Sequence, residues 1–261
     1  MEAMVLSSVR RVVRGGYIAG GSGSRRGTGL RNEAPPGARL VLEPGGELTY
    51  GRIRARLSDD GSLEACDDYN CIRARVPRGS SVMLDPVPPL NTPSRISNCL
   101  YIEFEEQLIV PGGRSSFWAT APYEFMIHVD GIVLGYLSPL RVKYTLIGDI
   151  VDGVVCRYHR SMVADSHTEL TAGGGVGLLP IMFRGSPGRV PGIGFYASGV
   201  PLFTDGSVVY YPEVEAEVDQ LRLTVRATQR PPLEGLREAR RARLRAGGLL
   251  PQVFVVTLEG A

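Results

Sequence analysis

The stretch RVKYTLIGDIVDGVVCRYHRS, residues 141–161, shows the pattern from which most of this chain is built. Two apolar runs that carry aromatic residues, Val142–Ile147 and Val154–His159, flank a short loop with two aspartates and Gly153. Short runs of β-branched and aromatic residues bounded by turn residues are typical of β-strands. The stretch therefore predicts two strands joined as a hairpin.

Outward from this hairpin, short apolar runs keep alternating with turn signals. Ile53, Ala55 and Leu57 alternate with arginines, which is the period-2 pattern of a strand with one face in water. Asp130–Gly131 and Asp205–Gly206 each separate two apolar runs, and both dipeptides tolerate the positive φ of tight hairpin turns. These patterns predict an all-β protein, an antiparallel β-sandwich built either as one large sandwich or as two packed small ones.

One late segment departs from the strand pattern. Residues 233–246 are rich in Ala, Leu, Glu and Arg, follow two prolines and precede two glycines, which are typical start and stop signals of a helix. We expect a surface helix inserted before a last strand, Gln252–Leu258. Its arginines make it a candidate docking element for an acidic partner. The candidate partner-binding residues are Arg237, Arg240, Arg241 and Arg245.

Residues 1–37 differ from the rest in composition. They carry six arginines against two glutamates and a Gly/Ser-rich run, which predicts a basic, flexible tail. Alternatively, Val5–Val13 forms a short basic amphipathic helix that touches acidic lipid or nucleic acid. We expect residues 38–261 to form the β-sandwich part, with an internal domain boundary near residues 136–141.

The overall charge excludes little. The 261 residues carry a formal net charge of +2, with 43% hydrophobic and 21% charged residues, so the totals force neither disorder nor a strongly anionic partner. Of the 29 basic residues, all but Lys143 are arginine, which we attribute to coding bias. Aromatic stacking partners are sparse among the strand arginines, so we expect a solvated face there in preference to a nucleic-acid surface.

The cysteine content indicates the compartment. Four cysteines are too few to predict a disulfide scaffold, and no apolar run reaches the roughly 18 residues of a membrane span, so we expect a soluble, cytoplasmic protein. Cys66 and Cys71 flank an apparent hairpin loop, where a local disulfide is geometrically feasible if the source is a hyperthermophile. Zinc is not expected there, because the spacing is too wide and no second Cys or His pair lies nearby.

The hairpin at residues 141–161 holds the candidate ligand-binding residues Lys143, Tyr144, Arg157 and His159. One register places Lys143 opposite Tyr158 and Tyr144 opposite Arg157. It keeps like charges apart, and we therefore prefer it. In this register Lys143 is buried and needs a carboxylate. The candidates are Asp149, Asp152, Glu103 and Glu124.

The other register opposes Lys143 to Arg157 or His159. Like charges directly opposite each other are unfavourable unless an anion lies between them. In that case Lys143, Arg157 and His159 would form an anion-binding patch. Both readings remain open on the sequence alone.

Other chemistry is sparse. His128 alternates with Met126 and is expected to be a structural histidine that points inward. His159 and His167 do not have a standard metal-ligand spacing, and the chain contains no Gly-x-Ser-x-Gly motif. We therefore expect no catalytic residue, no metal and no cofactor.

Several segments together resemble one protein family. KYTLIGDIVDGVVCRYHRS, the upstream runs PVPPLNTP, IVPGG and PYEFMIHV, and the later Val209–Tyr211 are similar to the uncharacterised, mainly archaeal family called domain of unknown function 432. The resemblance covers residues 39–225 and leaves out the basic tail and the late helix. It implies an archaeal cytosolic β protein without assigned activity. In some relatives the gene lies beside, or is fused to, a small mechanosensitive-type channel, which implies an accessory of a membrane protein.

Two functional hypotheses from different classes follow, and a third, nucleic-acid binding through the basic tail and the late helix, requires a continuous basic stripe in space. The first is a non-catalytic binding or regulatory β-sandwich module whose partner is another protein, soluble or membrane-embedded, which contacts a sheet edge or the arginine face. The second is an enzyme or binder that acts on a small anionic or sugar-phosphate ligand through the hairpin cluster of Lys, Tyr, Arg and His, and it requires those side chains to converge in a pocket.

Overall fold

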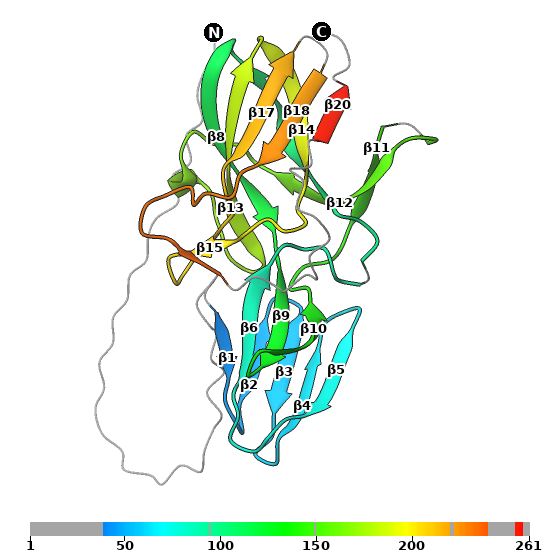
Figure 1. Cartoon of the computed structure of the whole chain (residues 1–261), viewed down its shortest axis with the longest axis vertical. Helices are drawn as coiled ribbons and strands as arrows, with labels where there is room; N and C mark the ends of the chain where they lie inside the picture. Colours follow the sequence, from blue (N-terminus) through cyan, green and yellow to red (C-terminus); the bar gives the residue numbers. More distant parts are fainter. Residues whose placement is uncertain (1–38, 94, 149, 220–221, 240–253, 258–261) are drawn as a thin grey trace, which may run out of the picture. The chain divides into compact units, whose positions relative to one another are not determined.

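The computed structural model describes residues 39–93, 95–148, 150–219, 222–239 and 254–257 (Figure 1). The regular elements in this part of the chain are strands, apart from one 3-10 turn, His167–Glu169. The prediction of an all-β fold is confirmed. The expected basic tail, including Val5–Val13, lies outside the described residues.

Sheet I has the strand order β1-β6-β9-β10, and all of its pairs are antiparallel. Every residue of β9 is buried. Asp130 and Gly131 connect β9 to β10 with φ angles of 47° and 88°, so the predicted hairpin turn is confirmed. The strands are β1 (Leu40–Leu42), β6 (Val82–Val87), β9 (Glu124–Val129) and β10 (Ile132–Leu137).

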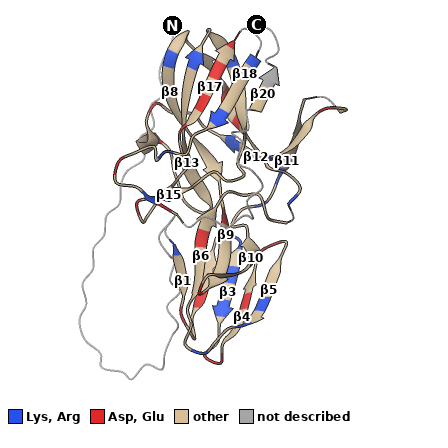
Figure 2. Cartoon of the chain, viewed as in Figure 1, with Lys and Arg blue, Asp and Glu red and all other residues tan. Residues whose placement is uncertain are grey.

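Sheet II is an antiparallel meander with the order β2-β3-β4-β5. In β3 the apolar residues are buried and the two arginines are exposed, as the period-2 pattern predicts. Charges of opposite sign face each other across the wet side, where Glu47, Arg56, Glu64 and Arg73 form a continuous row (Figure 2). The strands are β2 (Glu47–Tyr50), β3 (Ile53–Leu57), β4 (Ser62–Cys66) and β5 (Cys71–Arg75).

Sheet III contains the predicted hairpin of residues 141–161. Its order is β11-β12-β7-β14. Strand β12 pairs with β11 and β14 with β7 in antiparallel fashion, whereas β12 and β7 run parallel. The strands are β7 (Cys99–Val110), β11 (Tyr144–Ile147), β12 (Val154–Ser161) and β14 (Gly188–Tyr196).

Sheet IV has the order β19-β15-β16-β13-β17-β18-β20, with β8 paired to β13. Strand β13 runs parallel to β16 and β17, so sheets III and IV are mixed and the expectation of a purely antiparallel sandwich is corrected. The Asp205–Gly206 turn joins β15 to β16 as predicted. The strands are β8 (Gly113–Pro122), β13 (Val176–Gly185), β15 (Phe203–Thr204), β16 (Val209–Tyr210), β17 (Val214–Asp219), β18 (Arg222–Ala227), β19 (Arg237–Glu238) and β20 (Phe254–Thr257).

The sheets face each other in pairs. Sheet I contacts sheet II through β1 with β3 and β10 with β5, and sheet III contacts sheet IV mainly through β14 with β18 and β20. Buried apolar residues from all four sheets form one continuous core, and Leu178, Phe203 and Tyr210 of sheet IV form a small second cluster. Strands β7 and β8 lie between β6 and β9 in the chain, yet they belong to sheets III and IV. The chain therefore leaves the pair of sheets I and II after β6, returns at β9, and leaves it again after β10, near residues 136–141.

The helix expected at residues 233–246 is wrong over its described part. Gly235 has a φ of 80°, and Arg237–Glu238 forms strand β19 against β15. Leu233 and Leu236 pack instead on the small cluster that includes Phe203. Their tertiary packing outweighs the helix propensity of the surrounding alanines and arginines. Residues 240–246 lie outside the described residues.

All four cysteines form disulfides, which the cysteine count did not predict. Cys66 and Cys71 are direct partners across β4 and β5, so the local bond considered above is formed. Cys99 and Cys156 are direct partners across the parallel pair β7 and β12, and both are fully buried. The second pair could not be predicted, because its cysteines are 57 residues apart in the sequence and no local pattern brings them together.

The two disulfides should contribute unequally to stability. The chain-entropy model gives about 4 kcal/mol for a separation of 57 residues and about 2 kcal/mol for one of 5 residues. We expect Cys99→Ala/Cys156→Ala to lower the free energy of unfolding by roughly twice as much as Cys66→Ser/Cys71→Ser. Urea denaturation followed by circular dichroism measures both values, and equal losses would contradict the expectation.

Candidate functional site

The β11–β12 hairpin has the register that the sequence analysis preferred. Tyr144 pairs with Arg157 and Ile147 with Val154, and the backbone N–H of Tyr158 donates to the carbonyl oxygen of Lys143 at 2.9 Å. The register that would oppose Lys143 to Arg157 is not formed. Like charges are thereby kept apart, as the argument from cross-strand pairs requires.

Lys143 does not have the buried position that was expected for this register. Its side chain is exposed, because β11 begins only at Tyr144 and forms the edge of sheet III. Glu103 and Glu124, two of its expected carboxylate partners, are engaged elsewhere. Glu103 accepts a hydrogen bond from the Tyr158 hydroxyl.

Arg157 is the buried cation of this region. Only 3% of it is exposed. Nη1 donates to the carbonyl oxygen of Thr92 at 2.6 Å, and Nη2 donates to Oγ of Ser138 at 3.1 Å. Its charge and a side-chain hydrogen bond partly offset the burial that raises the pKa of Tyr144. The guanidinium therefore joins β12 to the segment after β6 and to the residue after β10.

Glu124 places a buried carboxyl group near Arg157. Its carboxylate is fully buried and accepts from the backbone N–H and side-chain Nδ2 of Asn91, at 2.8 and 2.5 Å, and from the N–H of Thr92 at 3.0 Å. Burial raises the pKa of Glu124 to about 7, although the Asn91 hydrogen bonds and the Arg157 charge act in the opposite direction. This network is structural in its geometry, because backbone groups and the side chains of Asn91 and Ser138 take up its donors and acceptors.

His159 follows Arg157 by two residues on β12 and has a different set of partners. Its Nε2 is 3.1 Å from Oγ1 of Thr120, which also donates to Oγ of Ser161 at 2.9 Å. Burial lowers the pKa of His159 to about 4, and the positive charge of Lys143 adds to the effect. The imidazole is therefore neutral at physiological pH.

The four predicted ligand-binding residues are thus only partly brought together. Tyr144 and Arg157 contact each other, whereas Lys143 points to solvent and His159 is bonded to Thr120. Of the predicted partner-binding arginines, Arg237 is exposed on β19. The other three, Arg240, Arg241 and Arg245, lie outside the described residues.

The hairpin tip has the feature that the sequence analysis missed. Ile150 and Val151 expose 93% and 88% of their surface, and Leu146 and Val155, which pair across the strands, expose 43% and 42%. We call these four residues the apolar hairpin surface. Their signal in the sequence was an Ile-Val pair inside an Asp/Gly loop, where apolar side chains have no strand neighbours to cover them.

The hairpin extends beyond the strand that supports it. The pairing of β12 with β7 begins at Cys156 and Cys99, so the residues of β12 before Cys156 have no β7 partner (Figure 1). On the opposite face from Leu146, Ile147 and Val154 line a shallow pocket of about 240 Å³ with Tyr196, Phe254 and neighbouring residues. The Cys99–Cys156 disulfide lies where the overhang starts and holds its base.

His128 and the cysteine pair of sheet II were the remaining candidates. His128 is buried, and its Nε2 is 2.8 Å from Oδ2 of Asp85, so the expected structural role is confirmed. Glu64, Cys66 and Cys71 hold potential ligand atoms within 4.8 Å of one another. With the sulfurs joined and Glu64 paired to Arg73, this group lacks the thiolates that a soft metal requires.

Comparison with known proteins identifies the chain at the level of a family. The sequence profile described as "Protein of unknown function (DUF432)" matches residues 36–257. The match confirms the resemblance stated above and extends it through the segment at residues 233–246. No curated protein and no solved structure matches the chain. Within the described residues, no helix has the length and hydropathy that a membrane crossing requires.

Glu124 and His159 should change the free energy of unfolding in opposite directions as the pH changes. The folded protein holds a proton on Glu124 up to a pKa of about 7 against an ordinary value of 4.5, so stability falls as pH rises through that window. The folded protein keeps His159 neutral down to about 4 against an ordinary value of 6.5, so stability falls as pH drops through that window. Between pH 4.5 and 6.5 the two effects oppose each other.

Two variants separate these effects. In Glu124→Gln only the histidine effect remains, and we expect the free energy of unfolding to fall by roughly 1.4 kcal/mol per pH unit as the pH is lowered from 6.5. In His159→Gln we expect it to fall at a similar rate as the pH is raised from 4.5 to about 7. Urea denaturation at a series of pH values measures the slopes. Profiles parallel to that of the wild-type protein would show that neither group titrates as described.

Proposed function

This chain belongs to the DUF432 family of proteins of unknown function, and we propose that it acts as a non-catalytic, protein-binding β module. The observation that carries the proposal is the apolar hairpin surface. Ile150 and Val151 lie almost fully exposed at the tip of a hairpin that overhangs its sheet. A chain gains no folding free energy by exposing such residues, and large apolar side chains left in water at the end of one element mark an interaction site.

The geometry of β11 supports the same proposal. Among the described strands, β11 pairs with β12 only and forms an edge of sheet III. An edge strand offers backbone N–H and C=O groups to an added strand, and flanking side chains then provide specificity. Leu146 and Val155 lie side by side on one face of this edge and would bury against such a partner.

The charges around the tip favour a protein over a lipid surface. Asp149 and Asp152 flank the Ile150–Val151 pair in the sequence. Cytoplasmic leaflets carry a negative surface potential that repels carboxylates. We infer that the partner is a protein with an apolar pocket and a basic rim.

The anion-binding alternative has less support. Arg157 donates to Thr92 and Ser138 in a buried position, and Lys143 stands apart from it at the surface. A small anionic ligand requires converging, accessible donors. The hydrogen bonds of Arg157 to Thr92 and Ser138 hold the hairpin base.

The family resemblance suggests which partner to test first. A membrane channel of the mechanosensitive type is our first candidate, and the chain would then act as a cytoplasmic, regulatory accessory at the membrane surface. The apolar hairpin surface would enter a pocket on the cytoplasmic part of such a channel.

The test compares two variants of the tagged full-length chain in affinity purification from source-cell lysate. We expect Ile150→Ser/Val151→Ser to lower the recovery of a stoichiometric partner by about tenfold or more, because central apolar anchors dominate binding energy. Ile132→Ser is the matched control, since Ile132 is 69% exposed on β10 of sheet I, and it should retain the partner. Mass spectrometry of separated membrane and soluble fractions identifies the partner.

Both variants should keep the stability of the wild-type protein within about 0.5 kcal/mol, because the substituted side chains are exposed. Equal recovery from both variants would refute the role of the hairpin. A wild-type chain that is purified without any stoichiometric protein would refute the module itself. A partner found only in the soluble fraction would refute the channel as its identity.

A further inference from the structure

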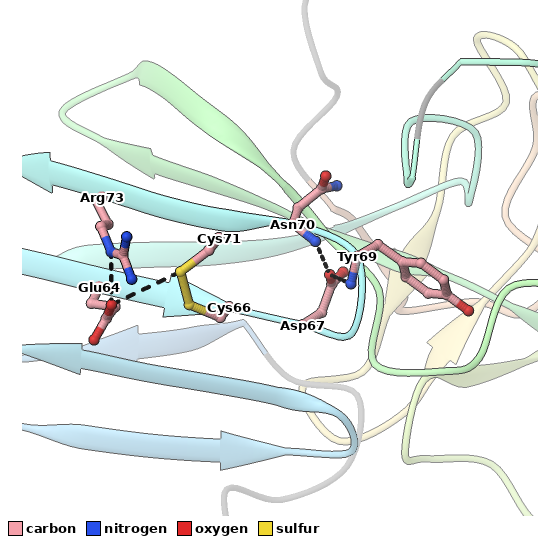
Figure 3. The surroundings of a disulfide bond; sticks show 7 residues. All are labelled: Glu64, Cys66, Asp67, Tyr69, Asn70, Cys71 and Arg73. Carbon is pink, nitrogen blue, oxygen red and sulfur yellow. Dashed lines mark hydrogen bonds and ion pairs between the residues drawn. A yellow bond between two sulfur atoms is a disulfide. The ribbon is translucent and has the colours of Figure 1, made fainter.

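We propose that the Cys66–Cys71 disulfide is a thiol–disulfide exchange site, which a small thiol opens reversibly by attack on the sulfur of Cys71. Figure 3 shows the bond at the end of the β4–β5 hairpin of sheet II. This proposal is independent of the hairpin in sheet III. It concerns a different sheet and a different chemistry.

Accessibility is the first argument. Cys71 is exposed and Cys66 is partly exposed, and β5 is the edge strand of sheet II. Cys66 alternates with Ala65, whose side chain is fully buried, so the disulfide lies on the wet face of the sheet. An incoming thiol can therefore approach the Cys71 sulfur without any opening of the fold.

The local charge is the second argument. Arg54 is the direct cross-strand partner of Cys66, and Arg73 follows Cys71 by two residues on the same face. Oε1 of Glu64 lies 4.0 Å from Sγ of Cys71 and 2.8 Å from Nε of Arg73, so these two opposite charges pair beside the attacked sulfur. Arg54 is the remaining cation, and it stabilises a thiolate on Cys66, the sulfur that leaves.

The exchange balances in two steps. A thiolate attacks Sγ of Cys71, a mixed disulfide forms, and the Cys66–Cys71 bond breaks with its electron pair leaving on Cys66 as a thiolate. A second molecule of the same thiol then attacks the small-molecule sulfur of the mixed disulfide, and Cys71 leaves as a thiolate. The products are the protein dithiol and one oxidised small disulfide. In the reverse sequence the Cys71 thiolate attacks the small disulfide and releases one thiolate, and the Cys66 thiolate then attacks Sγ of Cys71, releases the second thiolate and restores the bond.

The loop explains why the opened pair can close again. Oδ1 of Asp67 accepts the backbone N–H groups of Tyr69 and Asn70, each at 2.7 Å, and the N–H of Asp67 donates to the carbonyl oxygen of Asn70 at 2.9 Å (Figure 3). Oδ2 of Asp67 also accepts the N–H of Ser138 at 2.6 Å. These bonds do not involve sulfur, so they keep the two cysteines opposite each other after reduction.

The second disulfide provides a control within the same molecule. Cys99 and Cys156 are fully buried between β7 and β12. A thiol reaches them only in molecules that have opened locally or globally. The two bonds should therefore differ in rate under identical conditions.

The experiment exposes the native full-length chain to reduced glutathione in the presence of a metal chelator. Samples are quenched with an alkylating reagent and analysed by peptide mass spectrometry. We expect Cys66–Cys71 to open roughly 100-fold faster than Cys99–Cys156, because the buried bond waits for rare openings. We expect the glutathione adduct on Cys71 and, after addition of oxidised glutathione, quantitative return of the intramolecular bond.

Variants test the role of charge. Arg54→Gln should slow the opening by roughly threefold or more, since it removes the cation beside the leaving sulfur. Arg189→Gln, which alters an exposed arginine on β14 of sheet III, is the matched control and should leave the rate unchanged. Circular dichroism confirms that each variant is folded.

Three results would overturn the proposal. Equal opening rates for the two disulfides would show that exposure does not decide the reaction. An adduct found on Cys66 alone would contradict the attack at Cys71. Persistence of glutathione adducts after oxidation would show that the loop does not hold the pair ready to close.

Discussion

The burial of Arg157 is the constraint on which the surrounding structure depends. A guanidinium cannot give up its charge in a protein, so its burial requires acceptors and a compensating anion. The carbonyl oxygen of Thr92 and the hydroxyl of Ser138 accept its hydrogen bonds. Burial raises the pKa of the nearby Glu124, and the positive charge of Arg157 partly offsets that rise. Glu124 is in turn held by the Asn91 and Thr92 amides. Segments after β6, in β9, after β10 and in β12 are thereby joined, although they are far apart in the chain.

The same region explains how a hairpin with an apolar tip can be held in a defined place. Its base is fixed by the Arg157 hydrogen bonds, by the Tyr158–Glu103 hydrogen bond and by the Cys99–Cys156 disulfide to β7. Its tip exposes Ile150 and Val151. A rigid base with an exposed apolar end is an arrangement suited to binding, because little conformational entropy is lost when a partner covers it.

Charge and sulfur chemistry are both governed by position in the sheets. The arginines of sheet II alternate with carboxylates across its strands, as in the row from Glu47 to Arg73, so their excess charge is largely neutralised locally. Cys66–Cys71 lies on this wet face, whereas Cys99–Cys156 is enclosed in the core. The same covalent bond is therefore accessible to thiols in one place and protected from them in the other. Disulfides persist in oxidising compartments and in intracellular proteins of hyperthermophiles.

The sequence by itself determined the all-β class, the hairpin turns at Asp130 and Asp205, the family and the register of the β11–β12 hairpin, because period-2 alternation, turn chemistry and like-charge repulsion act between near neighbours. It did not determine the parallel pairing of β7 with β12, the Cys99–Cys156 bond or the buried partners of Arg157. Each of these joins residues far apart in the chain, and only the packed sheets bring them together. The same reason explains Lys143 and the late segment. An edge position left Lys143 in solvent, and packing on the Phe203 cluster outweighed the helix propensity that residues 233–246 carry locally.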